Sequence, residues 1–269
     1  MTLNYLVAKH GLDKINSVTK YPSILTYHQL GSKGGLKDEL IENGFPADTK
    51  LYITEKVDGT NGRFVYLNGD YFIGQREMFV YAKEDRIHNS EIIEPIVDSL
   101  YEVTTDVDVF TVIYGEVYGY KIQDGSKVYC TEGNTDRKFR LFDIWQMPIE
   151  ELDEYLSKAD MQQIVYDREH NWQPWLNVID FEQLANTFNL GITPRRGTIN
   201  SDDLPVSAIE TKGWLEFNFK DSLSTIGDGV GTNQKFGKAE GVVIRTLDRS
   251  IIRKLRFEDY HKGEMKGWK

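Results

Sequence analysis

The sequence predicts a mixed α+β fold with a largely antiparallel sheet, and three observations support this fold class. Short runs of alternating apolar and polar residues end at glycine or at an Asn-Gly pair, as the strands of antiparallel hairpins do. Longer segments carry apolar residues at helical spacing. No internal repeat or linker interrupts the 269 residues. We therefore expect one domain over residues 1–269, with residues 1–50 as an N-terminal extension packed on it and no separate C-terminal domain.

The elements follow from these patterns in chain order. The alternating run LYITEKV predicts a strand, and the pair Asn68-Gly69 predicts the tight turn of the next hairpin. Strands are expected at residues 51–57, 62–67, 71–74, 108–119, 139–145, 239–246 and 251–257. Helices are expected at residues 86–103, around 148–165 and around 179–189.

Composition excludes several classes of protein. Cys130 is the only cysteine, so neither an internal disulfide nor a thiolate zinc cluster can form, and the five histidines lack metal-ligand spacing. The apolar runs are too short to cross a bilayer, so we expect no membrane partner and a cytoplasmic location. The net charge of −10 argues against general coating of nucleic acid, although residues 249–269 are locally basic.

The segment EKVDGTNGR, residues 55–63, places Lys56 near a strand end, just before Gly59. A surface strand that runs into a turn would explain this equally well, and a K-x-D-G string alone is weak evidence. A lysine nucleophile also fits, because neighbouring cations or burial lower the pKa of an amine and free its lone pair. Lys254 and Arg256 would supply such cations if their strand lies beside Lys56. Gly59 would let the backbone pass close to a bound nucleotide.

Further residues that can carry chemistry follow Lys56 in a set order, each in or beside a predicted strand. Each has an ordinary explanation alone: an aromatic core residue, a salt-bridged carboxylate or a half-exposed strand. They are Arg76 in GQRE, Glu116 in YGEVYG, Phe142 in FRLFDIW, Glu240 in EGVVIR, and Lys254 with Arg256 in RKLRF.

Together with K-x-x-G-T-N, this order resembles the covalent nucleotidyltransferase superfamily of ATP-dependent ligases and mRNA capping enzymes. Within it the chain is most similar to phage-type nick-sealing RNA ligases and RNA-editing ligases. The resemblance runs from Leu51 to Phe257. It implies an ATP-grasp-like nucleotidyltransferase (adenylation) domain. The expected location is the cytoplasm of a cell, including a cell infected by a phage or virus.

The resemblance also implies a role for each motif residue around a nucleotide that becomes bound to Lys56. By resemblance, the expected catalytic residues are Lys56, Asp58, Glu240 and Lys254. Asp58 stands where some nick-sealing RNA ligases carry histidine, and Arg245 and Arg256 replace lysines. By resemblance, Glu55 and Asn61 border the adenosine and phosphate sites, Glu116 binds ribose, and Phe142 and Val243 enclose adenine. Glu240 positions Lys56 or a metal-bound water. The phosphates are bound by Arg245, Lys254 and Arg256, and Arg76 contacts phosphate or the RNA 3′ end.

The expected function is ATP-dependent joining of nicked or broken RNA ends, with Mg²⁺ or Mn²⁺ as the metal. Lys56 would take AMP from ATP, pass it to an RNA 5′-phosphate, and a 3′-hydroxyl would then displace AMP. A DNA ligase, an adenylyltransferase for another 5′-phosphate or a protein, and a non-catalytic module that binds nucleotide or RNA ends remain alternatives. Many relatives carry a further C-terminal domain, so we expect the first fifty residues or a partner protein to dock the RNA.

Overall fold

The computed structural model describes residues 1–31, 34–80, 92–93, 96, 108–123, 129–130, 135–223 and 237–264. The chain forms two compact units, and each is assembled from three separate segments. The first unit comprises residues 1–23, 59–118 and 137–192, and the second comprises residues 24–58, 119–136 and 193–269. The expected N-terminal extension, residues 1–50, is therefore divided between the two units. That the two units act as one domain is still a prediction. Most of the helix predicted at residues 86–103 lies outside the described residues.

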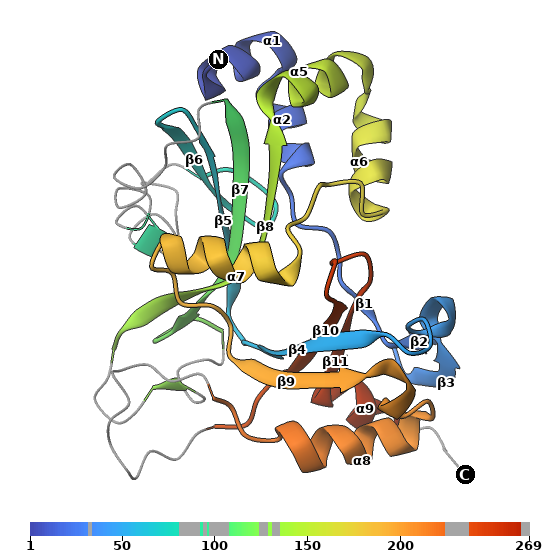
Figure 1. The fold of residues 1–269 in the computed structure, drawn as a ribbon. Helices are drawn as coiled ribbons and strands as arrows, with labels where there is room; N and C mark the ends of the chain where they lie inside the picture. Colours follow the sequence, from blue (N-terminus) through green and yellow to red (C-terminus); the bar gives the residue numbers. More distant parts are fainter. Residues whose placement is uncertain are drawn as a thin grey trace. The chain divides into compact units, whose positions relative to one another are not determined.

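The first unit contains a four-stranded sheet in the order β6-β5-β7-β8 (Figure 1). Strands β5 and β6 form the predicted hairpin: Asn68 and Gly69 have φ of 49° and 89°, as a type I′ turn requires. Strand β7 pairs with β5 in antiparallel register on its other side. The strands are β5 (Thr60–Leu67), β6 (Asp70–Gln75), β7 (Val109–Gly119) and β8 (Arg137–Pro148).

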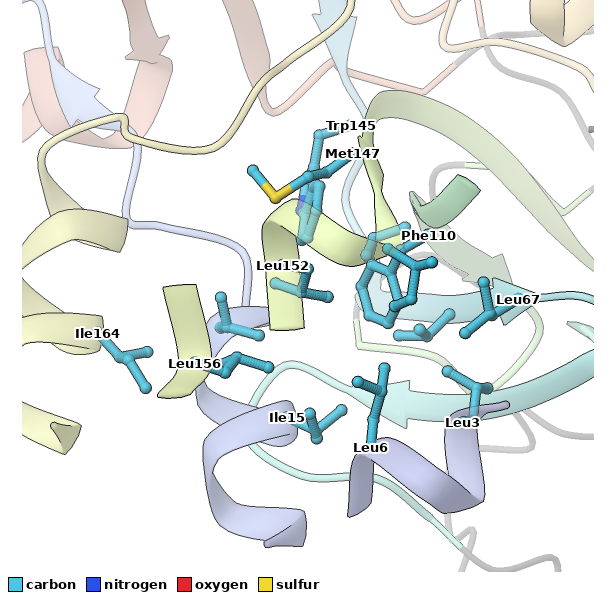
Figure 2. Packing of buried hydrophobic residues seen from close by; sticks show 14 of the residues in the cluster. Leu3, Leu6, Ile15, Leu67, Phe110, Trp145, Met147, Leu152, Leu156 and Ile164 are labelled. Atoms are coloured by element: carbon cyan, nitrogen blue, oxygen red, sulfur yellow. The ribbon is translucent and has the colours of Figure 1, made fainter. Parts of the chain in front are cut away.

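Helices pack a large apolar core against one face of this sheet. Leu3 and Leu6 of α1 lie beside Phe110 and Trp145 of the sheet, and Leu152 of α5 joins the same cluster (Figure 2). These side chains are almost fully buried, so each contributes roughly 1.5–3 kcal/mol to folding. The helices of this unit are α1 (Leu3–His10), α2 (Leu12–Val18), α5 (Ile149–Lys158), α6 (Met161–Glu169) and α7 (Val178–Thr187).

The helix predicted around residues 148–165 is two helices, α5 and α6. Ala159 is extended, with φ −79° and ψ 135°, and ends α5. The Asp160 carboxylate accepts a hydrogen bond of 2.8 Å from the Gln163 amide and caps α6. Because aspartate is a strong N-cap residue, the chain restarts a helix here despite its continuous apolar spacing.

The second unit contains a five-stranded sheet in the order β1-β11-β10-β4-β9 (Figure 1). β1 is parallel to β11, and the other pairings are antiparallel. The predicted strands at residues 51–57, 239–246 and 251–257 are confirmed as β4, β10 and β11. The strands are β1 (Leu25–Thr26), β4 (Lys50–Lys56), β9 (Arg195–Asn200), β10 (Gly241–Thr246) and β11 (Ile252–Arg256), with a separate pair β2 (His28–Leu30) and β3 (Leu36–Leu40).

The two faces of this sheet differ in character. Leu51, Ile53, Val242, Ile244 and Leu255 point into the core of the unit. Since side chains alternate along a strand, Tyr52, Thr54 and Lys56 of β4 share the opposite face. The core is covered by α8 (Ala208–Phe219) and α9 (Phe257–Glu264), and short 3₁₀ helices lie at Ile41–Asn43 and Ser201–Asp203. Among the described residues, no helix is long and apolar enough to span a bilayer.

Candidate active site

Lys56 stands at the end of β4, in line with residues from two other strands. Its Cα pairs with Gly241 of β10, and Gly241 pairs with Arg256 of β11. The next row along the sheet runs from Thr54 to Val243 to Lys254. The strand that carries Lys254 and Arg256 is therefore not directly beside β4 as the prediction required: β10 lies between them, and Arg256 shares a row with Lys56 across it. Antiparallel pairing brings together residues that are far apart in the sequence.

The glycine of EGVVIR is required by this close strand packing. A Cβ atom at Gly241 would lie 2.0 Å from the Leu255 carbonyl oxygen and 2.8 Å from Arg256 Cα. No side chain fits between those backbone atoms, so only glycine allows β10 and β11 to pair at the end of the sheet where Lys56 stands.

Lys56 forms an ion pair with Glu240, the residue just before β10. Lys56 Nζ donates a 2.6 Å hydrogen bond to Glu240 Oε2. The Lys56 side chain is 25% exposed and the Glu240 side chain is 22% exposed, so solvent can reach both. The pair brings together two of the four residues predicted to be catalytic.

Glu55 lies on the opposite face of β4 from Lys56 and is 1% exposed. Its carboxylate accepts hydrogen bonds from the Ser222 hydroxyl, from the Leu223 amide at 2.6 Å and from Arg196 Nη1 at 3.3 Å. These donors offset the cost of burying the charge. The carboxylate is thus engaged within the protein, and a nucleotide contact from Glu55, still a prediction, would come from its backbone.

Tyr129 is an additional residue beside Lys56 that the sequence motifs do not include. Its buried hydroxyl accepts a 2.6 Å hydrogen bond from the backbone N–H of Asp58. Burial raises the pKa of Tyr129, and the nearby carboxylates of Glu55, Asp58 and Glu240 raise it further, so the phenol stays protonated. Tyr129 therefore fixes the backbone just after the lysine. A tyrosine in a polar loop gives no sequence signal for this role.

The other basic motif residues of this unit lie on the Lys56 face of the sheet. Arg256 makes two hydrogen bonds to the buried Asp259, of 2.8 and 2.7 Å, which raise the pKa of Arg256. The Arg245 guanidinium lies over the Tyr52 ring, 5.5 Å from its centroid. Lys254 is half-buried in the row that contains Val243. Four basic side chains thus share this face in a chain whose net charge is negative, and two of them, Lys56 and Arg256, are paired with carboxylates.

The remaining predicted residues belong to the first unit. Asn61 of β5 pairs directly with Glu116 of β7. Phe142 contacts Tyr21 edge-on, with ring centroids 4.9 Å apart. Arg76 is exposed and donates to the Ser23 hydroxyl at 3.3 Å.

Gly59 begins the second segment of the first unit, and packing within that unit already requires glycine there. Its expected approach to a nucleotide stays a prediction. A Cβ atom there would lie 2.3 Å from the Val117 carbonyl oxygen and 2.9 Å from Glu116 Cγ. The structure thus requires glycine because the backbone at this position packs directly against β7.

The order and spacing of these residues agree with a known family. The profile of RNA ligases matches residues 49–260. This chain belongs to the RNA ligase family. No curated protein sequence matches it.

Solved structures of Naegleria gruberi RNA ligase share the fold of this family member. A variant with ATP and Mn has a TM-score of 0.53 at 17% identity, over 91% of this chain and 62% of that chain. A variant with AMP and Mn gives 0.52 at 18%, over 89% and 62%. The enzyme with PPi gives 0.52 at 17%, over 91% and 62%. This RNA ligase family chain thus spans about three fifths of their length. The likeness supports the mixed α+β nucleotidyltransferase fold.

The donor atoms around Lys56 suit a metal that is carried largely by substrate. Among the described residues, no three His, Cys, Asp or Glu side chains cluster as a metal site. Glu240 offers a partly exposed carboxylate next to Lys56. Mg²⁺ commonly binds one or two carboxylates and completes its shell with water and substrate phosphates. Glu240 is thus the residue of this site that could hold such a metal through a water, with the other ligands supplied by substrate.

Proposed function

We propose that this chain is an ATP-dependent RNA ligase that joins RNA 3′-hydroxyl and 5′-phosphate ends. The observation that carries the proposal is the placement of Lys56 on a basic sheet face, paired with Glu240 and in register with Gly241 and Arg256. Membership of the RNA ligase family supports the same conclusion. ATP and Mn in the Naegleria gruberi structures support ATP and a divalent metal as reactants here.

In the proposed first step, Lys56 Nζ attacks the α-phosphorus of ATP. A phosphoramidate bond forms, the bond to the pyrophosphate oxygen breaks, and the amine loses a proton. Because an ammonium has no lone pair, Lys56 must lose a proton before attack, and Glu240 Oε2, 2.6 Å from Nζ, would accept it. Lys254, Arg245 and Arg256 would offset the negative charge that the phosphates carry in the transition state.

The next two steps transfer AMP and seal the ends. An RNA 5′-phosphate oxygen displaces Lys56 from the α-phosphorus and forms an RNA-adenylate. A 3′-hydroxyl then attacks the 5′-phosphate and releases AMP, so each step makes one bond to phosphorus and breaks one. Mg²⁺ or Mn²⁺, held by Glu240, water and the phosphates, would supply charge neutralisation in this site.

The proposal also covers nucleoside binding, RNA docking and cellular location. Asn61, Glu116 and Phe142 would bind the nucleoside, and Arg76 a phosphate or the RNA 3′ end, as the resemblance implies. RNA docking would fall to the first fifty residues or to a partner protein. The expected location is cytoplasmic.

The intact mass of the protein after incubation with ATP and Mg²⁺ tests the proposal. We expect the wild type to gain one AMP, the gain to reverse with pyrophosphate, and Lys56→Ala to show none. Absence of the adduct, in protein first stripped of bound AMP with pyrophosphate, would contradict covalent catalysis and favour a binding module. Sealing assays on nicked duplexes with RNA, DNA and hybrid ends then separate an RNA ligase from a DNA ligase. If none of these nicks is sealed, the result would favour an enzyme that transfers AMP to another acceptor.

A further inference from the structure

Arg195, which no motif includes, lies on the Lys56 face of the second unit. It is exposed at the start of β9, the edge strand next to β4. Its Cα pairs with Thr54, which places it in one row with Thr54, Val243 and Lys254. The register shifts between Ile53 and Thr54, so alternation along β9 does not by itself set the face of Arg195. Its guanidinium lies over the ring of Tyr52, which shares a face with Thr54 and Lys56, and Arg195 therefore adds a positive charge to that face.

Arg195 and Arg245 converge on one aromatic ring. The guanidinium carbon of Arg195 lies 5.3 Å from the Tyr52 ring centroid, and that of Arg245 lies 5.5 Å from it. They reach the ring from the two strands that flank β4, as the order β10-β4-β9 requires (Figure 1). Tyr52 is only 1% exposed, so it is a support and not a stacking surface for a base.

The two arginines differ in how much of them faces solvent. Arg245 is 3% exposed, whereas Arg195 is exposed. The face of an aromatic ring attracts a guanidinium within about 6 Å, and the N–H donors of the guanidinium stay available to an anion. Phosphate is the ligand that such donors bind in bidentate fashion. Arg195 thus offers donors to solvent, and the nearby Arg245 charge favours an anion there.

The direction of the Arg195 side chain favours an RNA phosphate over the ATP triphosphate. The Cα of Arg195 lies opposite Thr54, whereas its guanidinium lies over the ring of Tyr52, one further step along the same face of β4 from Lys56. The side chain therefore points along β4 away from Lys56, where the α-phosphate of ATP must sit. A polynucleotide strand reaches both places, because its phosphates repeat along the backbone.

We propose that Arg195, supported by Tyr52 and beside Arg245, binds a backbone phosphate of the RNA strand that Lys56 adenylates or seals. The site rests on the proposed RNA ligase function and adds a contact outside the family motifs. It binds charge and not sequence, so it positions an RNA end without selecting its bases.

Binding of a labelled nicked RNA duplex, measured over a series of salt concentrations, tests the site. Arg195→Ala is expected to weaken binding about fivefold and to lower the slope of log K against log salt by about 1, as loss of one phosphate contact does. Arg195→Lys should restore part of the affinity, because it keeps the charge without the planar fork. Lys220→Ala removes an equal charge from an exposed position directly after α8 of the same unit and should leave the slope unchanged.

Two further measurements identify the source of the phosphate and separate the site from the chemistry. If Arg195→Ala instead raises the KM for ATP in Lys56 adenylation and leaves RNA binding intact, the RNA assignment is overturned in favour of the triphosphate. Unchanged RNA binding and an unchanged KM would overturn the site altogether. If the wild type binds RNA with the expected dependence on Arg195 but never gains AMP, the ligase function fails and the phosphate site stands. Thermal melting of each variant confirms that it is folded, and Arg195→Gln serves as a second neutral variant.

Discussion

The ammonium nitrogen of Lys56 lies 2.6 Å from a carboxylate oxygen of Glu240, although 184 positions separate the two residues in the chain. Pairing of β4 with β10 brings them together, because Gly241 stands opposite Lys56 and Glu240 directly precedes it. The contact is charge-assisted and only partly exposed, so it holds the lysine in one position while leaving it accessible to a ligand.

Glu240→Ala should slow formation of lysyl-AMP by about 10²-fold, which is typical for loss of one positioned charged group in an active site. Lys56 would lose its hydrogen-bond partner, and the metal would lose a carboxylate. The measurement is the single-turnover rate of AMP transfer from labelled ATP. Glu240→Gln is the matched variant, because it keeps the shape and an acceptor but not the charge.

The metal dependence of these variants distinguishes the two roles of Glu240. If the carboxylate binds metal, Glu240→Gln should need a higher Mg²⁺ concentration for half-maximal rate than the wild type. An unchanged Mg²⁺ dependence with a slow rate would restrict Glu240 to positioning Lys56. A wild-type rate in both variants would contradict either role.

Tyr129→Phe should reduce both the rate of lysyl-AMP formation and the free energy of unfolding. The Asp58 amide would lose its 2.6 Å acceptor in a buried place, a loss of about 1–3 kcal/mol. Tyr155→Phe, which removes a hydroxyl bonded to Asp167 in the first unit, is the control. Urea unfolding and the adenylation rate are measured for both. Loss of stability in both variants, with adenylation slowed only by Tyr129→Phe, would identify Tyr129 as a positioning residue.

Gly241→Ala should destabilise the protein by more than about 2 kcal/mol, because overpacking against fixed backbone forces strands apart. Its Cβ would lie 2.0 Å from the Leu255 carbonyl oxygen. Gly213→Ala is the matched control, since nothing lies within 4 Å of a Cβ at that helical position. There alanine should raise the free energy of unfolding by roughly 0.5–1 kcal/mol through helix propensity. Equal effects of the two substitutions in urea unfolding would refute this account.

The elements predicted correctly are those whose local pattern and tertiary role agree. β5 and β6 carry both alternation and an Asn-Gly turn, and β4, β10 and β11 alternate against one core. β9 was not predicted, because RRGTIN has no apolar alternation and its pairing depends on β4. A single apolar pattern likewise could not reveal the break at Asp160, which is set by a side-chain cap.

The candidate site divides in the same way. Lys56, Glu240 and Gly241 belong to motifs, and their order along the chain was sufficient to bring them into one prediction. Arg196, Ser222 and Tyr129 contact motif residues only through the tertiary fold, so no local pattern marks them. The sequence predicts that Glu55 borders the nucleotide site, but no local pattern shows that protein donors such as the Leu223 amide bind its buried carboxylate.

His28 predicts how stability depends on pH, because it is fully buried and both ring nitrogens are bonded. Nε2 lies 2.8 Å from the Val206 carbonyl, which can only accept, so Nε2 carries the proton. Nδ1 then accepts from the Tyr260 hydroxyl at 2.9 Å. Protonation of Nδ1 would reverse the direction of that bond, since a phenol oxygen can also accept, and would bury a charge. Burial accordingly lowers the pKa of His28 below 6.5, against weaker opposing effects of Val206 and Asp38.

The unfolded chain therefore binds a proton at His28 at a higher pH than the folded chain does. The stabilisation from neutral His28 is complete above the unfolded pKa of about 6.5 and is lost as the pH falls through the lower folded pKa. We expect the wild type to lose more unfolding free energy between pH 7.5 and 5.5 than His28→Gln, which cannot titrate. Urea unfolding at both pH values measures the difference, and His261→Gln, at an exposed histidine, is the control. An equal gap between wild type and His28→Gln at the two pH values would show that His28 does not titrate with folding.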